Sequence, residues 1–411
     1  MTPPRVVITG MGAVSPHGKG VQPFWDGLLA GRAAFRPITL FDAQAFRNAQ
    51  AGEVDGYPIL PEGPPRALRM LDDACAEALG DALHAPNADA AALCEKTKTC
   101  PDLRGAALVA GTNFGGMSAA EVALIEGETD PSKASLDPYL FGAATARLAR
   151  QYGLHGPRLN LSLSCASGAA AIGVAFDLIR QGRVQAAIAC GYDELSLFVY
   201  AGLCALRAVT PETIRPFDKR RKGTLFSEGA GAMVLERLES ATARGARIHA
   251  EILGRAMNND AYHMTAPEQE AHGIRTLMRA ALDDARLSAD RIGHLNLHAT
   301  GTPYNDKIET KAVLDVFGPR GREIPVAAVK SSIGHTMGAA GLIESIAAVQ
   351  SLNTGRIPPV VGLDPAEKDP ECDLKVAVSA PLEAPFDLAL KTSYGFGGTN
   401  AAVVLGRYPT A

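Results

Sequence analysis

The chain has 411 residues, of which 47% are hydrophobic and 20% are charged, a composition typical of a globular protein with a large buried core. The net charge is −4 with both signs interspersed, which argues against nucleic acid or an anionic membrane as the main partner. No signal peptide and no membrane-spanning run of about 18 apolar residues is expected from the sequence.

Short β-branched or apolar runs alternate with helical patterns along most of the chain. In the first part, strands are expected at 5–14, 106–111, 159–164, 186–190 and 231–235, and helices at 22–30, 140–152 and 167–181. In the second part, strands are expected at 248–253, 294–298, 326–330, 374–378, 389–394 and 401–405, and helices at 274–285, 306–317 and 337–352. This alternation predicts an α/β fold with mostly parallel, buried sheets. The stretch 85–105 breaks the pattern and is expected to be a solvated loop or an excursion, not a domain linker.

Two distant segments resemble each other. Residues 228–236 (Glu-Gly-Ala-Gly-Ala-Met-Val-Leu-Glu) and 397–406 (Gly-Gly-Thr-Asn-Ala-Ala-Val-Val-Leu-Gly) are both small-residue turns that lead into an apolar strand. Each closes about half of the chain. We therefore predict two similar layered halves, residues 1–245 and 246–411, with a ligand site at the seam between them.

Cysteines are scattered through the chain, odd in number and without the spacing of a zinc site. They are Cys75, Cys94, Cys100, Cys165, Cys190, Cys204 and Cys372. So large a chain does not need disulfides, so we expect a cytoplasmic protein with mostly inert, reduced thiols. No metal site is expected, and a reactive cysteine has to be found by its context.

Cys165 has that context, because an apolar strand ends at residues 161–165 (Leu-Ser-Leu-Ser-Cys) and a helix of small residues follows at once. Free N–H groups and the helix dipole at such a position favour the thiolate, which lowers the pKa of the thiol. The small residues let the helix pack tightly behind the sulfur. Cys165 is therefore the candidate nucleophile, although a structural cysteine would fit the local pattern equally well.

Residues 296–302 (Asn-Leu-His-Ala-Thr-Gly-Thr) place His298 at the end of an expected strand. A loop there is well suited to bring an imidazole to a ligand. Thr300 and Thr302 lie in this loop, and Asp306 follows in the first turn of a helix. A buried structural histidine with Asp306 as a helix cap would explain part of the segment.

Residues 329–335 (Val-Lys-Ser-Ser-Ile-Gly-His) repeat the same design and end at His335. Glu344 lies fourteen positions after Lys330 in the following helix. Neither charge tolerates burial alone, so Lys330 and Glu344 are expected to form a buried ion pair. A generic glycine-rich turn is the alternative.

Residues 394–398 (Tyr-Gly-Phe-Gly-Gly) surround one aromatic side chain with glycines. Gly395 and Gly397 allow a backbone with positive φ close to a ligand, and Phe396 could act as a mobile gate. A plain turn between strands is the alternative. Each of the four segments is a moderate signal, and their joint order along the chain is far more specific.

In that order the segments resemble the β-ketoacyl-acyl-carrier-protein synthases of the KAS I/II group in the thiolase superfamily, over nearly the whole chain. The resemblance implies a thiolase-like fold of two βαβαβαββ halves in five α/β/α/β/α layers, and a homodimer. It implies that Cys165 accepts the acyl group and that His298 and His335 are catalytic. It also assigns Lys330 and Glu344 as the buried catalytic pair.

Further roles follow from the resemblance alone. Thr300 and Thr302 would bind the phosphopantetheine arm of an acyl carrier protein, and Thr265 would lie along its tunnel. The backbone N–H groups of Cys165 and Phe396 would form an oxyanion hole. Two more assignments end the set: Phe114 at the floor of the acyl pocket, and Arg66 and Arg69 for docking the carrier.

The implied reaction is a decarboxylative condensation of malonyl-carrier with the acyl group on Cys165, without a metal or redox cofactor. A degradative thiolase needs a second cysteine in its C-terminal turn, and residues 395–398 contain none. An initiating synthase has a Cys-His-Asn site instead of Cys-His-His. A non-catalytic chain-length subunit would typically lack the nucleophile.

Several departures from the family pattern leave the pathway open. Ala299 replaces a glycine, Leu163 and Ser164 replace Thr-Ala, and Pro211 stands where the fatty-acid enzymes have a docking arginine. Phe114 is larger than the aliphatic residue common at that position, so either the pocket is shortened or reshaped, or the ring turns into the core. Fatty-acid elongation and a specialised polyketide or polyene pathway both fit, as do a homodimer and a heterodimer with a chain-length-factor-like subunit.

Overall fold

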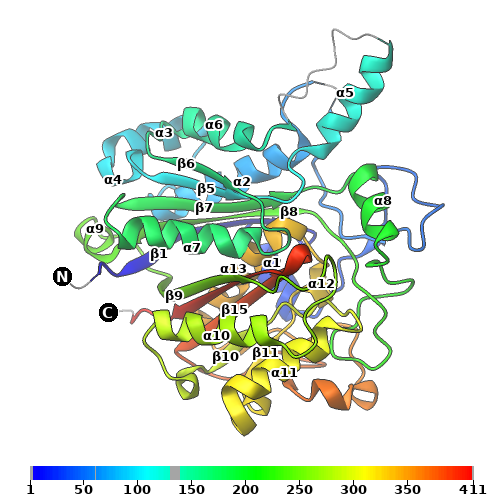
Figure 1. The fold of residues 1–411 in the computed structure, drawn as a ribbon. Coiled ribbons are helices and arrows are strands. Elements are labelled where there is room, and N and C mark those ends of the chain that lie inside the picture. Colours follow the sequence, from blue (N-terminus) through cyan, green and yellow to red (C-terminus); the bar gives the residue numbers. More distant parts are fainter. Residues whose placement is uncertain (1–2, 61, 130–138, 410–411) are drawn as a thin grey trace.

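The computed structural model describes residues 3–60, 62–129 and 139–409 (Figure 1). The main strands of the first half are β1 (Val6–Ser15), β5 (Ala107–Gly111), β6 (Arg158–Leu161), β7 (Ala186–Asp193) and β8 (Gly229–Arg237). Those of the second half are β9 (Ala250–Asn259), β10 (His294–Asn296), β11 (Pro325–Ala327), β15 (Leu388–Gly395) and β16 (Thr399–Gly406). Short strands are β2 (Gly18–Lys19), β3 (Arg36–Pro37), β4 (Gln50–Ala51), β12 (Arg356–Ile357), β13 (Lys375–Val376) and β14 (Leu382–Glu383).

The two halves have the same strand topology. The spatial order is β6-β5-β7-β8-β1 in one half and β11-β10-β15-β16-β9 in the other, so equivalent strands take equivalent places. In the first half β5 pairs in parallel with β6 and β7, and β8 pairs antiparallel with β7 and β1. In the second half β10 pairs in parallel with β11 and β15, and β16 pairs antiparallel with β15 and β9. The predicted duplication is confirmed. The two similar segments at 228–236 and 397–406 contain most of β8 and all of β16, which are equivalent strands of the two halves.

Helices lie on both outer faces and between the halves, which gives the expected five layers (Figure 1). The longer helices are α2 (Arg66–Ala82), α6 (Phe141–Tyr152), α7 (Ser167–Arg180), α10 (His272–Asp284), α11 (Asn305–Phe317) and α13 (Ala340–Thr354). α2 and α6 cover the first half, whereas α10, with α11 beside it, covers the second. α7 and α13 form the central layer, and each contacts strands of both halves.

The central helices are close because small residues line their contact. A Cβ atom on Gly341 would lie 2.4 Å from the backbone nitrogen of Ala169, and one on Gly168 would lie 2.7 Å from that of Leu342. No side chain fits at either position. The run of small residues after Cys165 therefore serves tight packing, as expected from the sequence.

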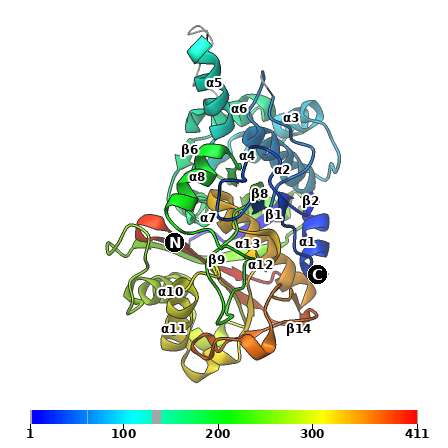
Figure 2. The same ribbon diagram turned by 90° about the vertical axis from the view of Figure 1, so that its right-hand side faces the viewer.

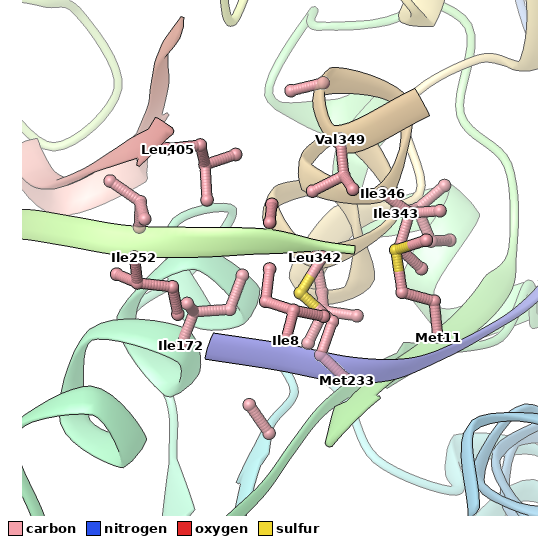
Figure 3. Close-up of a cluster of buried hydrophobic side chains, with 14 of the residues drawn as sticks. Ile8, Met11, Ile172, Met233, Ile252, Leu342, Ile343, Ile346, Val349 and Leu405 are labelled. Atoms are coloured by element: carbon pink, nitrogen blue, oxygen red, sulfur yellow. The ribbon is translucent and has the colours of Figure 1, made fainter. Parts of the chain in front are cut away.

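A hydrophobic cluster joins the two sheets to the central helices (Figure 3). Ile8 and Met233 from the first half, Ile252 from the second, and Ile172 and Leu342 from the central helices belong to one buried cluster, each at most 2% exposed. Complete burial of one such side chain stabilises the fold by about 1.5–3 kcal/mol. The link between α9 (Leu238–Ala243) and β9 contains the expected boundary at 245/246, which stays a prediction.

The segment 85–105 is a helical excursion and not a solvated loop. It contains α3 (Ala90–Thr99) and α4 (Pro101–Arg104). Asp89 caps α3 by accepting a hydrogen bond from the backbone N–H of Ala92 at 2.8 Å, and Leu93 is buried. An N-cap aspartate followed by alanines and leucine is a helix signal that the polar composition obscured.

The remaining α-helices of the described residues are α1 (Val21–Leu29), α5 (Met117–Thr129), α8 (Leu197–Ala205) and α12 (Lys330–Ile333). α5 projects beyond the layers, with α8 nearby (Figure 2). Within the described ranges, no helix has both the length and the apolar character needed to cross a bilayer.

Candidate active site

One cavity of about 330 Å³ at the seam between the halves brings together most of the predicted site residues. Cys165 comes from the first half, and His298, His335 and Phe396 come from the second. Its wall also includes Thr265, Thr300 and Thr302. The cavity thus combines the sulfur, two imidazoles and the glycine-rich turn.

Cys165 lies in a tight turn just before α7. The preceding residue, Ser164, has φ of 49°, a left-handed conformation that is strained for a residue other than glycine. Ser167 holds the turn, because its Oγ donates to the carbonyl of Ser164 at 2.6 Å and accepts from the N–H of Leu163 at 2.8 Å. The candidate nucleophile Cys165 therefore follows a strained residue whose conformation is held by the hydrogen bonds of Ser167.

The glycine-rich turn at 394–398 packs directly against the turn that contains Cys165. Thr399 Oγ1 donates to the carbonyl of Leu163 at 2.8 Å, and a Cβ on Gly395 would lie 2.8 Å from Ser164 Cβ. Gly397 has φ of 79°, so the turn requires glycine there. The half-buried Phe396 is thereby held beside Cys165, at the place that the gate and oxyanion-hole assignments need.

Burial raises the pKa of the Cys165 thiol to about 12. The charge of Lys330 and hydrogen bonding by the backbone N–H groups of Phe396 and Cys165 act in the opposite direction but do not offset it. The expectation of a pKa lowered by the helix terminus is therefore wrong, because the cost of burying a thiolate is larger. Cys165 rests as a thiol.

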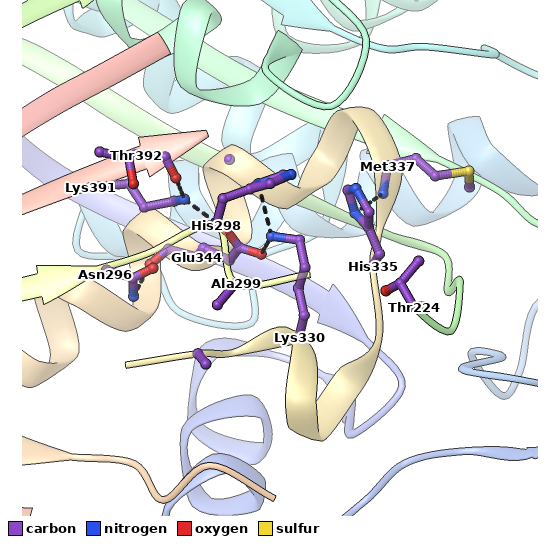
Figure 4. A network of polar contacts seen from close by, with 12 residues as sticks. Thr224, Asn296, His298, Ala299, Lys330, His335, Met337, Glu344, Lys391 and Thr392 are labelled. Atoms are coloured by element: carbon purple, nitrogen blue, oxygen red, sulfur yellow. Dashed lines mark hydrogen bonds and ion pairs between the residues drawn. The ribbon is translucent and has the colours of Figure 1, made fainter. Parts of the chain in front are cut away.

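Both histidines are fixed in the same tautomer (Figure 4). Lys330 Nζ donates to His298 Nδ1 at 3.2 Å, and the backbone N–H of Met337 donates to His335 Nδ1 at 3.2 Å. Burial, together with the charge of Lys330, lowers the pKa of both imidazoles well below its ordinary value. Each ring is neutral with Nδ1 as acceptor, so each has its proton on Nε2.

The backbone around His298 is held by Glu309, a residue that the sequence did not single out. Its carboxylate accepts from the N–H groups of His298 and Ala299 at 2.8 and 2.9 Å and from Thr392 Oγ1 at 3.1 Å. Ala299 has φ of 41°, where the family pattern has glycine. Asp306 is not the helix cap considered from the sequence; it lies inside α11 and accepts from the backbone N–H groups of Gly301 at 3.1 Å and Phe217 at 3.0 Å.

Lys330 and Glu344 form the expected buried ion pair. Lys330 Nζ donates to Glu344 Oε1 at 2.5 Å, and the two side chains are 1% and 2% exposed. Lys330 lies at the start of α12 and not at the end of a strand, so the turn brings its ammonium under the His298 ring. The pair connects the central helix α13 to the site.

Thr300 and Thr302 face each other in the cavity wall, with their Oγ1 atoms 3.0 Å apart. Their role toward the phosphopantetheine arm, and that of Thr265, stay predictions. Phe114 is absent from the wall of this cavity; it packs against an apolar cluster that includes Met117. Its role at the floor of an acyl pocket likewise stays a prediction.

Arg66 does not have the predicted docking role, because it is 3% exposed and its guanidinium bonds to Glu228 and to the carbonyl of Val54. The side chain of Arg69 donates to the carbonyl of Pro58, and its docking role stays a prediction. Two exposed cations that the sequence did not single out, Arg207 and Lys222, line the cavity instead.

Replacing Arg66 by methionine is expected to lower the free energy of unfolding by about 3–5 kcal/mol, because Glu228 would keep a buried charge without its cation. Arg69→Met, a change to the neighbouring arginine on α2, should have a much smaller effect. Denaturant-induced unfolding of both variants measures the difference. Equal stability of the two variants would contradict the buried-pair assignment.

The thiolase-like fold and a cavity that joins a cysteine to two neutral histidines define a thiol-dependent acyltransferase. The family models for the beta-ketoacyl synthase N-terminal and C-terminal domains match residues 4–241 and 249–364. The chain belongs to the β-ketoacyl synthase family, whose members catalyse condensation.

Individual relatives agree with this assignment. A 3-oxoacyl-[acyl-carrier-protein] synthase 2 of a Synechocystis species is 35% identical, with 98% of each chain covered. The granaticin polyketide putative beta-ketoacyl synthase 1 of Streptomyces violaceoruber is 36% identical, again over 98% of each chain. Among solved structures, the ishigamide ketosynthase/chain length factor has a TM-score of 0.87 at 35% identity and covers 99% of this chain and 100% of its own.

Proposed function

We propose that the chain elongates an acyl group held on Cys165 by decarboxylative condensation with a malonyl group on an acyl carrier protein. The observation that carries this proposal is the pair of neutral imidazoles, each with an Nε2–H donor, in the same cavity as the thiol. Two such donors suit an oxygen that becomes negatively charged during the reaction.

In the first step Cys165 attacks the thioester carbonyl of an acyl-carrier. The N–H groups of Cys165 and Phe396 stabilise the tetrahedral oxyanion. The carbon–sulfur bond to the carrier breaks, and the proton of the Cys165 thiol ends on the departing phosphopantetheine thiol. The acyl transfer therefore releases no net proton, since the carrier thiol gains the proton that Cys165 loses.

In the second step malonyl-carrier loses carbon dioxide, and the electron pair of the broken carbon–carbon bond forms a thioester enolate. His298 and His335 donate their Nε2–H groups to its oxygen. The enolate carbon attacks the acyl group on Cys165, and the released thiolate takes a proton from solvent. Atoms and electrons balance without a metal or redox cofactor, since the phosphopantetheine arm carries the substrates.

Arg207 and Lys222 are proposed to guide the carrier, because carrier proteins are acidic and both cations are exposed at the cavity. The charge-reversed variant Arg207→Glu/Lys222→Glu should raise the KM for acyl-carrier by about tenfold or more, with little change in kcat. High salt should shrink the difference. Steady-state kinetics with an acyl-pantetheine substrate, which has no protein surface, is the control; an equal loss there would contradict docking.

A dimer is proposed, because exposed apolar side chains gather on two helices at one end of the molecule. Leu124 and Ile125 on α5 are 64% and 68% exposed, and Phe198 on α8 is 62% exposed. Such a patch suits a partner subunit. The partner is a second copy in the main proposal, or a chain-length-factor-like subunit in the alternative, as in the ishigamide ketosynthase/chain length factor.

The experiment that tests the proposal is intact-mass detection of acyl groups on Cys165. The chain is incubated with acyl-carriers of several lengths, alone and with candidate chain-length partners, and malonyl-carrier is then added. Acylation and β-ketoacyl-carrier formation by the chain alone support the main proposal in fatty-acid or polyketide elongation. Product only with a partner supports the specialised alternative, and no acylation by any donor contradicts both.

Free thiols at all seven cysteines support a cytoplasmic location.

A further inference from the structure

A second buried lysine lies beside the pair formed by Lys330 and Glu344 (Figure 4). Lys391, on β15, is 0% exposed, and its Nζ is 2.8 Å from Glu344 Oε2. Lys330 binds the other oxygen of the same carboxylate. Lys391 also donates to the carbonyl of Thr392. The reaction described above makes no use of Lys391, yet burying an ammonium is costly and calls for a reason.

The charges in this cluster balance only when Lys391 is counted. Lys330 and Lys391 supply two ammonium groups, and Glu344 and Glu309 supply two carboxylates, with every side chain at most 2% exposed. Without Lys391 the cluster would carry a net negative charge next to His298. The pKa of a buried imidazole rises beside a negative charge, because its protonated form is stabilised.

The other titratable groups that face His298 are neutral. His335 lies edge-on to it, with ring centroids 5.3 Å apart, and Tyr394 of β15 lies edge-on at 5.5 Å. Cys165 shares the cavity and rests as a thiol. The charged groups of α11, α12, α13 and β15 named above therefore set the electrostatic environment of the ring.

We propose that Lys391 is a positioning residue, which shares Glu344 with Lys330 and so leaves Lys330 free to donate a hydrogen bond to His298 Nδ1. The inference rests on the proposed role of His298 as an Nε2–H donor to the enolate. With Lys391 in place, the negative charge of Glu344 is neutralised by two ammonium groups and not by Lys330 alone. The acceptor state of Nδ1, and with it the Nε2–H tautomer, is then secured.

Protonation of His298 would undo this arrangement. An imidazolium has N–H on both nitrogens, so its Nδ1–H would point at the ammonium of Lys330 and repel it. Burial and the charge of Lys330 do most to lower the pKa of His298 and His335, and the positive charge of Lys391 lowers both further. Removing that charge raises these pKa values, so the histidines become protonated, and the enzyme inactive, at a higher pH. The acid limb of the pH profile of decarboxylation therefore shifts to higher pH.

The test is the pH profile of malonyl-carrier decarboxylation by the full-length protein, compared with the rate of Cys165 acylation. Lys391→Met should slow decarboxylation by about 10- to 100-fold at neutral pH, which is the usual cost of losing a residue that orients a catalytic group. Its acid limb should shift to higher pH, and acylation should change much less. Lys391→Arg, which keeps the charge, should restore most of the rate and the original limb.

Lys375→Met, at an exposed lysine of β13, is the matched control and should behave as the unmodified protein. If Lys391→Met does not fold, Lys391→Gln replaces it as the uncharged variant and must show the same shift. An unshifted acid limb in a folded, uncharged variant overturns the inference and leaves the proposed function intact. An unmodified protein that acylates Cys165 but does not decarboxylate malonyl-carrier overturns the proposed function itself.

Discussion

Replacement of Cys165 by serine is expected to reduce condensation by at least about 10³-fold, because a hydroxyl is a far weaker nucleophile than sulfur at the same position. Serine is nearly isosteric, so the turn before α7 and the thermal stability should be retained. Intact-mass spectrometry should find no acyl group on the variant, and product analysis should find no β-ketoacyl-carrier. Acylation of the variant at another residue would disprove the assignment of the nucleophile.

The matched control is Cys204→Ser, a half-buried cysteine of α8 that does not line the cavity. It should acylate and condense like the unmodified protein.

The raised pKa of Cys165 predicts a pH dependence of its reactivity. Below a pKa of about 12 the thiolate fraction grows with pH, so alkylation of Cys165 should accelerate steadily from neutral to alkaline conditions.

That the candidate residues Cys165 and His335 would lie at one seam could be predicted, because the position of each depends on the local direction of the chain. Cys165 and His335 both lie in the turns that lead into the central helices α7 and α13, which are equivalent elements of the two halves. A strand followed by a turn and a small-residue helix is visible in the sequence without knowledge of the rest of the fold. The repeated topology then brings the two turns to the same seam.

Other features depend on contacts between distant residues and could not be predicted. Arg66 pairs with Glu228, 162 positions away, and nothing in the helical pattern around Arg66 indicates that its guanidinium points inward. Lys391 resembles a solvated lysine in its strand, because buried lysines are rare. The pKa of Cys165 depends on how deeply the finished fold buries it, and a sequence pattern reports the helix terminus but not the burial.

The histidines should be separable from the nucleophile by their effects on the two half-reactions. His298→Ala and His335→Ala each remove one Nε2–H donor, so each should slow decarboxylation of malonyl-carrier by about 10²- to 10³-fold. Acylation of Cys165 should stay within a few-fold of the unmodified rate, because its oxyanion is stabilised by the backbone N–H groups of Cys165 and Phe396.

Quantification of carbon dioxide release and of the Cys165 acyl adduct in the same reaction measures both half-reactions at once. His155→Ala, at an exposed histidine outside the cavity, is the control. The double variant should lose less than the product of the two single effects, since both donors act on one oxygen. Equal loss of acylation and decarboxylation in either single variant would mean that the histidine acts on the thiol, and the assignment of two neutral donors to the enolate would have to be abandoned.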